Sequence, residues 1–176
     1  MSLSIAVFYG SSTGNTMNAA EKIKEQLGDW IQSINDVAKC EPEAMLPYDV
    51  LLLGCSTWNI GEMQDDWAAF MLRMKGLNLR GKKVGFFCMG DAKGYPYNFL
   101  DAMGELWTLV KSLGAELVGV WPKAGYTFNE SAAMFDEDHF LGVGLDEENE
   151  PDLHDERLQG WLVQVMNELG LLEGIA

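Results

Sequence analysis

One short stretch gathers more hydrogen-bonding side chains than any other part of the chain: Gly10-Ser11-Ser12-Thr13-Gly14-Asn15-Thr16. It follows an apolar run, Leu3–Tyr9, and precedes a helix-patterned segment that starts near Met17. A helix N-terminus presents unpaired N–H groups and the positive end of its dipole, so this arrangement suits an anion. The loop contains no Lys or Arg and matches neither the Walker A nor the G-x-G-x-x-G pattern. It predicts a phosphate site built from neutral donors; the alternative is a Ser/Thr-rich connection with an N-cap.

Two further loops each hold a large aromatic residue among turn-forming residues. They are Cys55–Glu62, with Trp58, and Gly90–Asn98, with Tyr95. Aromatic side chains are usually buried, so two of them in converging loops are unexpected. Two aromatic faces that converge could hold a planar heterocycle by stacking. The alternative for each ring is that it folds back onto the core.

The elements that must position these loops alternate between strand and helix. Apolar runs predict strands over Leu3–Tyr9, Trp30–Val37, Val50–Gly54, Lys83–Met89 and Glu116–Trp121. Helical spacing predicts helices over Met17–Leu27, Gln64–Met74, Tyr97–Leu113 and Glu156–Leu169, the last with Asp155 as N-cap. This pattern predicts an α/β fold, a doubly wound five-stranded parallel sheet of order 2-1-3-4-5 between two helix layers. Ligands of such sheets bind beyond the carboxyl ends of the strands, where the three loops would meet.

The stretch Pro122–Asp152 is long, acidic and dotted with glycine, with one strand-like patch at Phe140–Leu145. Long loops are uncommon without a purpose. We expect an excursion that interrupts the fifth strand and returns through that patch. The whole chain, 1–176, is expected to form one domain that contains this insertion at about 122–145.

Composition narrows the possible partners. The formal net charge of −15 makes nucleic acid an improbable partner, and no apolar run is long enough to span a membrane. No signal-peptide pattern is present, so we expect a cytoplasmic protein, and the charge favours a monomer. From Ala124 to Glu156 there are eleven Asp or Glu and no Lys or Arg, which would either solubilise the protein or steer a basic partner. The three Cys and two His residues lack metal-ligand spacing, so no metal site is expected.

Taken together, the three loops closely resemble those of the flavodoxins. The motifs are Gly10–Thr16, Thr57-Trp58-Asn59-Ile60-Gly61-Glu62, and Gly90-Asp91 with Gly94-Tyr95 and Asn98-Phe99-Leu100-Asp101-Ala102. The resemblance extends over essentially the whole chain, including Gly142–Glu147 and Asp155-Glu156-Arg157. The excursion at Pro122–Leu145 looks like the insertion of the long-chain branch.

The resemblance implies non-covalent FMN and low-potential one-electron transfer between the semiquinone and the hydroquinone. It implies a carrier and not an enzyme, with flavodoxin reductase-type donors and acceptor enzymes as basic redox partners docking on the acidic face. The residues that it assigns to the cofactor are Ser11, Ser12, Thr13, Gly14, Asn15, Thr16, Ser56, Thr57, Trp58, Asn59, Ile60, Gly61, Cys88, Met89, Gly90, Asp91, Tyr95, Asn98, Phe99 and Asp146.

The implied roles follow the order of the chain. The first loop would hold the phosphate, and Thr57 with the Trp58 backbone would lie near the ribityl chain, together with Asp146. Trp58 and Tyr95 would sandwich the ring, with Asn59–Gly61 along its N5 edge and the Cys88–Asp91 backbone along its pyrimidine edge. A carbonyl of the Asn59–Ile60 peptide, with Gly61 leaving room to rotate, is the candidate acceptor for the N5 proton.

The sequence departs from the family pattern where Ala92 replaces the usual Gln and Cys88-Met89 the usual glycine-rich pair. Two alternative functions on this kind of fold are less well supported by the residues. One is an FMN-dependent NAD(P)H oxidoreductase on the same fold, but the sequence contains no dinucleotide-binding fingerprint. A phosphoacceptor regulator would need clustered acids at the end of the first strand, where this chain has Tyr9-Gly10-Ser11.

Overall fold

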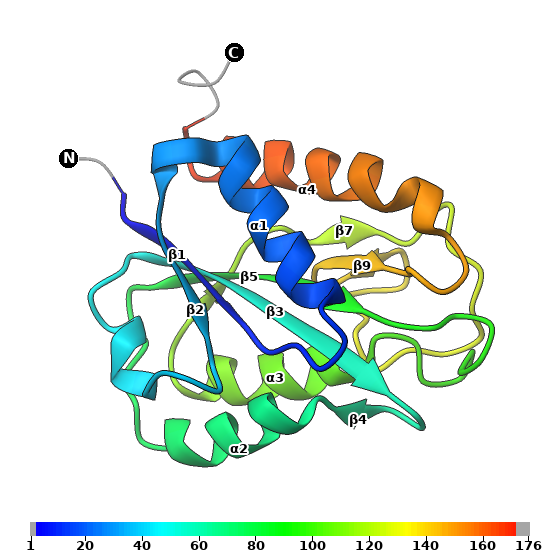
Figure 1. Cartoon of the computed structure of the whole chain (residues 1–176), viewed down its shortest axis with the longest axis horizontal. Coiled ribbons are helices and arrows are strands. Elements are labelled where there is room, and N and C mark those ends of the chain that lie inside the picture. Colours follow the sequence, from blue (N-terminus) through cyan, green and yellow to red (C-terminus); the bar gives the residue numbers. More distant parts are fainter. Residues whose placement is uncertain (1–2, 172–176) are drawn as a thin grey trace.

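A parallel sheet lies between two layers of helices in the computed structural model, which describes residues 3–171 (Figure 1). The sheet runs in the order β2-β1-β3-β5-β6. Its strands are β1 (Ile5–Tyr9), β2 (Ile31–Asp36), β3 (Val50–Trp58), β5 (Lys83–Met89) and β6 (Glu116–Leu117). This order confirms the predicted doubly wound topology, in which the strand order reverses between β1 and β3.

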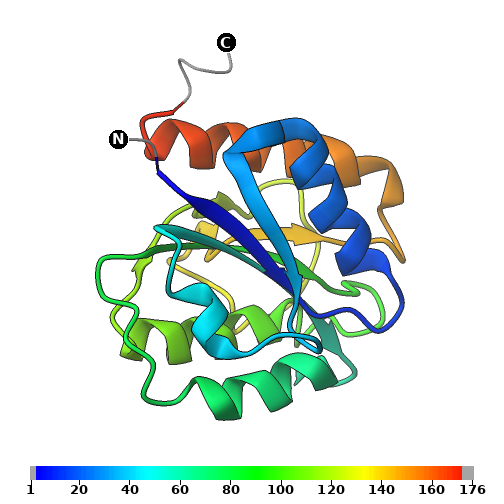
Figure 2. The same ribbon diagram turned by 60° about the vertical axis from the view of Figure 1, so that its left-hand side comes forward.

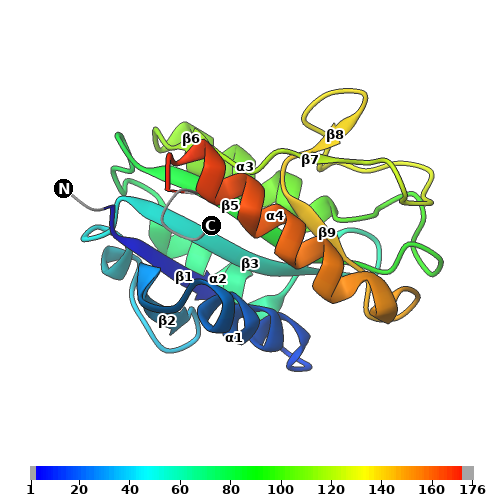
Figure 3. The ribbon, with the colours of Figure 1, turned by 90° about the horizontal axis from the view of Figure 1, so that it is seen from above.

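The helices cover both faces of the sheet. One face carries α1 (Asn15–Leu27) and α4 (His154–Glu168), and the other carries α2 (Asp65–Met74) and α3 (Asp101–Ser112) (Figures 1 and 2). Seen from above, α1 and α4 lie side by side over the strands (Figure 3). Short 3₁₀ turns complete the chain: η1 (Gly28–Trp30), η2 (Pro42–Met45) and η3 (Pro151–Leu153).

The core consists of two apolar clusters, one on each side of the sheet. Within β1, Ile5 and Val7 belong to the cluster under α1 and α4, whereas Ala6 and Phe8 belong to the cluster under α2 and α3. Successive side chains of a strand point to opposite faces, so a strand covered on both faces must be apolar throughout. For this reason the central strands read as continuous apolar runs.

Several predicted boundaries were wrong, and tertiary contacts explain each shift. Strand β3 runs to Trp58 instead of ending at Gly54, because its last residues pair with β4 (Glu62–Met63). Helix α3 starts at Asp101 and not at Tyr97: Leu100 is left-handed (φ 62°) and Phe99 N donates to Glu130 O at 3.3 Å.

The predicted N-cap of the last helix was also wrong. Helix α4 starts at His154, and Asp155 lies within its first turn. The carboxylate of Asp155 instead accepts a hydrogen bond from Lys22 Nζ at 2.6 Å, so it joins α4 to α1.

The far edge of the sheet is made from two segments that are distant in sequence. Strand β6 pairs with the first two residues of β5, and β9 (Val143–Leu145) pairs with the last three. The strand predicted over Glu116–Trp121 is therefore broken after Leu117. Between the two segments the chain leaves the sheet and forms an antiparallel ribbon from β7 (Trp121–Pro122) and β8 (His139–Phe140). Among residues 3–171, no helix combines the length and the apolar character that crossing a membrane requires.

Candidate functional site

The loops that follow β1, β3 and β5 meet around one cleft at the carboxyl edge of the sheet. The cleft has a volume of about 300 Å³, at the lower end of the range for small-molecule sites. Its lining consists of Ser12, Thr13, Asn15, Thr16, Ser56, Thr57, Trp58, Asn59, Met89, Gly90, Asp91, Tyr95, Glu147 and Glu148. All of these except Glu147 and Glu148 are among the residues that the sequence assigned to a cofactor, and the structure brings them together.

The first end of the cleft is the N-terminus of α1. Its N-cap is Gly14, which adopts the left-handed conformation (φ 93°), and neither a side-chain cap nor an acidic residue occupies the first turn. The Ser11 hydroxyl accepts a hydrogen bond from Gly14 N at 3.0 Å, so it orders the loop itself. The hydroxyls of Ser12 and Thr13 and the first N–H groups of α1 are therefore the donors that an anion would meet.

The second end of the cleft carries the two aromatic rings. Trp58, at the end of β3, is 36% exposed, and Tyr95, in the loop after β5, is 37% exposed. The indole N–H of Trp58 donates to Ser56 Oγ at 2.9 Å, while the Tyr95 hydroxyl lies 3.5 Å from Asn59 Oδ1. Each ring thus makes a polar contact through its N–H or O–H, and more than a third of each residue is exposed, which suits a flat ligand in the cleft.

A strained turn connects Trp58 to β4. Asn59 adopts φ 47° and Gly61 φ 76°, and Gly61 N donates to Asn59 O at 3.0 Å. Positive φ is uncommon for a residue other than glycine. A Cβ at position 61 would also lie 2.8 Å from Asp101 Oδ2, so this position requires glycine. The turn leaves Ile60 highly exposed, outside the cleft lining.

Eight of the residues assigned from the sequence do not line the cleft: Ser11, Gly14, Ile60, Gly61, Cys88, Asn98, Phe99 and Asp146. Phe99 is buried among Tyr126, Phe128 and Phe140, and Asn98 Nδ2 donates to Asp101 Oδ2 at 3.1 Å. Thr57 lines the cleft, but its hydroxyl also accepts a hydrogen bond from Ala102 N at 3.2 Å and thereby anchors the start of α3.

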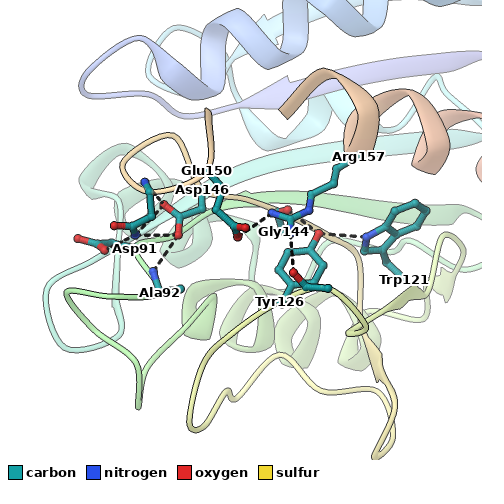
Figure 4. A network of polar contacts seen from close by, with 10 residues as sticks. Asp91, Ala92, Trp121, Tyr126, Gly144, Asp146, Glu150 and Arg157 are labelled. Carbon is teal, nitrogen blue, oxygen red and sulfur yellow. Dashed lines mark hydrogen bonds and ion pairs between the residues drawn. The ribbon is translucent and has the colours of Figure 1, made fainter. Parts of the chain in front are cut away.

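The side chain of Asp146 is turned into the protein. It is 1% exposed, and its carboxylate accepts a hydrogen bond from Ala92 N at 3.0 Å (Figure 4). It also accepts one from Asn149 N at 3.0 Å. These bonds tie the segment after β9 to the loop after β5. In this structure Asp146 supports the cleft wall from behind and does not line it.

Two lining residues, Glu147 and Glu148, were missed by the sequence analysis. They follow β9, which lies beside β5, so their position at the carboxyl end of the strand-like patch was the available signal. Glu147 Oε1 lies 3.2 Å from Nε2 of the buried His154.

The electrostatics of the lining are one-sided. It contains three carboxylates, Asp91, Glu147 and Glu148, and neither Lys nor Arg. Burial raises the pKa of Asp91, but hydrogen bonds from Gly94 N and Asn149 Nδ2 outweigh it and leave that pKa below its usual value. The cleft wall is therefore negatively charged at neutral pH.

Beneath the cleft, Cys55 of β3 and Cys88 of β5 are buried neighbours in the strand register. The hydrogen bond with Cys88, together with burial, raises the pKa of the Cys55 thiol well above its usual value. A protonated, buried thiol is a poor nucleophile. Among the described residues, no group of three or more His, Cys, Asp or Glu could hold a metal ion.

The chain is a doubly wound α/β protein with a cleft of small-molecule size at the point where its strand order reverses. The chain belongs to the flavodoxin family: the family model described as Flavodoxin matches residues 7–161. It is 44% identical to the flavodoxin of Synechococcus elongatus over 168 residues, which cover 95% of this chain and 98% of that one. It is 42% identical to flavodoxin 1 of Escherichia coli over 167 residues, 95% of each chain.

Solved structures agree with the family. A variant of the Fusobacterium nucleatum flavodoxin, crystallised with flavin mononucleotide, superposes with a TM-score of 0.88 at 25% identity. That match covers 96% of this chain and 98% of the other.

Proposed function

We propose that this protein binds FMN non-covalently in the cleft and serves as a low-potential one-electron carrier between the semiquinone and hydroquinone states. Family membership and the flavin mononucleotide in the Fusobacterium nucleatum relative support the proposal. The observation that carries it is the opposition of two features in one cleft: an uncapped helix N-terminus and two half-exposed aromatic rings.

The residues present fit each part of FMN. The hydroxyls of Ser12, Thr13 and Thr16 and the first N–H groups of α1 would hold the phosphate with neutral dipoles. Trp58 and Tyr95 would hold the two faces of the ring and exclude water from them. The bound flavin would supply the redox chemistry, which the side chains of the cleft do not provide themselves.

The charge of the cleft wall favours a low potential. Adding an electron to a bound group costs more when fixed carboxylates surround it and no cation offsets them. Asp91, Glu147 and Glu148 supply such charges at the cleft, and the whole chain carries −15. The Asn59–Gly61 turn would contribute a backbone carbonyl, because Gly61 leaves the Asn59–Ile60 peptide room to rotate.

A carrier needs partners but no substrate site of its own. We propose that basic redox proteins, a reductase-type donor and acceptor enzymes, dock on the acidic surface through weak, salt-sensitive contacts. The candidate acids for these contacts are Glu147 and Glu148 at the cleft and the exposed Asp136, Glu137 and Asp138 of the excursion. We also propose that the protein is a cytoplasmic monomer, and that it forms one domain with the long-chain insertion at about 122–145.

The purified protein should show flavin absorption bands, or regain them when FMN is added to the apoprotein. Stepwise reduction should populate a blue neutral semiquinone before the flavin is bleached. Mixing with NADPH alone should leave the flavin oxidised. NADPH together with a basic reductase should reduce it, at a rate that falls as the salt concentration rises. A colourless protein that does not bind added FMN would overturn the proposal. Fast reduction by NADPH alone would indicate an oxidoreductase instead.

A further inference from the structure

We propose that Asn149 is a positioning residue, which fixes the loop that carries Tyr95 by joining Asp91 to Asp146. The effect of Asn149 on the cofactor cleft rests on the proposed FMN function, whereas its effect on the loop does not. Asn149 itself does not line the cleft.

The carboxylates of Asp91 and Asp146 lie close together (Figure 4), and Asn149 forms a clamp between them. Asn149 Nδ2 donates to Asp91 Oδ1 at 2.8 Å, and also lies 2.9 and 3.1 Å from the two carboxylate oxygens of Asp146. A primary amide has two N–H donors, so one can serve each carboxylate. The backbone N–H of Asn149 donates to Asp146 Oδ1 as well, at 3.0 Å. One residue thus provides the donors that keep two like charges together.

The clamp reaches Tyr95 through the turn after β5. Asp91 accepts a hydrogen bond from Gly94 N at 2.8 Å through its carboxylate and from Tyr95 N at 3.0 Å through its carbonyl. Asp146 accepts one from Ala92 N at 3.0 Å. Both carboxylates held by Asn149 therefore bind backbone N–H groups of the turn that presents Tyr95.

The other side of the clamp is rigidly supported. Glu150 N donates to Asp146 O at 2.8 Å, and the Glu150 carboxylate lies 3.1 Å from Arg157 of α4. Arg157 in turn packs over the Tyr126 ring at 3.8 Å, and the Tyr126 hydroxyl donates to Gly144 O at 2.8 Å. The clamp therefore holds the loop against α4, β9 and the excursion (Figure 4).

The charge around the clamp makes its donor essential. The charged residues close to it in the chain are Asp91 and Lys93 after β5, and Asp146, Glu147, Glu148 and Glu150 after β9. From α4, Arg157 contacts Glu150 and His154 contacts Glu147. Arg157 is bonded to Glu150 and not to the clamp. Replacing the amide of Asn149 with a third carboxylate would remove the side-chain donor and add a like charge. The loop after β5 would then separate from the segment after β9, unless two of the carboxylates share a proton.

The test compares Asn149→Asp with Asn167→Asp, an identical change at an exposed position of α4. Hydrogen exchange of the apoprotein at pH 7 should show the amides of Ala92, Gly94 and Tyr95 exchanging on the order of tenfold faster in N149D. N167D should exchange like the wild type. This measurement involves no flavin.

Flavin titration then tests the consequence. N149D should bind FMN and riboflavin on the order of tenfold more weakly at pH 7, by the same factor for both, because the loop serves the ring and not the phosphate. At pH 5 the loss should shrink in N149D only. Asn149→Ala, which removes the donor without adding charge, should loosen the loop at both pH values and replaces N149D if that variant does not fold.

Wild-type exchange of these three amides in both N149D and N149A would overturn the clamp. A loss of FMN affinity without a loss of riboflavin affinity would also overturn it, since it would place the effect at the phosphate. If the wild type binds no flavin at all, the proposed function fails, and the exchange data still decide whether Asn149 fixes the loop.

Discussion

At the scale of single residues, the two half-exposed rings make the most direct prediction. Trp58→Ala and Tyr95→Ala should each weaken FMN binding by about 1–3 kcal/mol, roughly 5- to 150-fold in Kd, because each removes one stacking face. Fluorescence titration of the apoprotein with FMN measures the change. Both variants should also raise the potential of the second reduction step, since electron-rich faces disfavour added negative charge.

Tyr97 provides a matched control for this prediction. It lies two residues from Tyr95, is 60% exposed and does not line the cleft, so Tyr97→Ala should leave the Kd for FMN unchanged. Wild-type affinity in both ring variants would refute stacking as the mode of ring binding. An equal loss in Y97A would show that the substitutions act through the loop and not through the rings.

The candidate site was predictable from the sequence where a residue's role follows from its own loop. Trp58 and Tyr95 could be identified because large rings are usually buried, and a turn-rich loop at a strand end leaves them exposed unless a ligand covers them. The hydrogen bonds of Asp146 could not be predicted, because its side chain reaches Ala92 and Asn149 only once β9 has paired with β5. Its role as a support, and that of Asn149, depends on contacts between segments more than fifty residues apart.

At the scale of elements, the start of α1 should act as the phosphate site. The double variant Thr13→Ala with Thr16→Ala should weaken FMN binding by at least about 10-fold, since each hydrogen bond to a charged group contributes about 1.5–3 kcal/mol. Riboflavin, which lacks the phosphate, should lose little affinity. Parallel titrations with the two flavins measure this difference, and equal losses for both would mean that the loop does not hold the phosphate.

Helix α2 offers a test of stability linked to the same loop. The Gln64 side chain caps α2 by accepting a hydrogen bond from Trp67 N at 3.1 Å, and it also donates to Ser12 Oγ at 3.2 Å. Gln64→Ala should lower the free energy of unfolding by about 1–2 kcal/mol, the usual cost of a lost cap plus a buried partner. Urea unfolding measures it, with Gln159→Ala on the exposed side of α4 as control. No difference between the two variants would exclude Gln64 as a cap.

Element identity was predictable, whereas several element ends were not. The apolar runs and helical stripes specify the layers, because burial on one or two faces fixes the period of the sequence. The start of α3 depends instead on a left-handed Leu100 and on the excursion that pairs with Phe99, and neither has a local signal. The broken edge strand has the same origin, because β9 replaces β6 beside β5 only through a long-range contact.

At the scale of the whole molecule, charge sets the dependence of stability on pH, through two opposing effects. With a net charge of −15 and a pI near 4.3, acidification from pH 7 relieves repulsion among carboxylates. The opposing effect comes from carboxylates whose pKa is lowered in the folded protein. Hydrogen bonds from Ser4 lower the pKa of Asp49, and hydrogen bonds from Lys22 and His154 lower that of Asp155. Burial raises the pKa of Asp91, but its hydrogen bonds outweigh burial and lower it. A carboxylate with a lowered pKa in the folded state stabilises the fold above its unfolded pKa of about 3.9.

The stabilisation from these three carboxylates is lost as the pH falls through their lowered folded pKa values, so unfolding should become steep below about pH 4. Asp49→Asn tests one contribution, since Asp49 Oδ2 accepts hydrogen bonds from Ser4 N and Oγ at 3.0 and 3.1 Å and holds the start of β1 to β3. The variant should be less stable than the wild type at pH 7 and should lose less stability between pH 5 and pH 2. Urea midpoints across that range measure both. Glu43→Gln, which removes one charge at another exposed position, should follow the wild-type dependence of stability on pH. A D49N curve parallel to that of the wild type would exclude the Ser4 contact as a source of acid sensitivity.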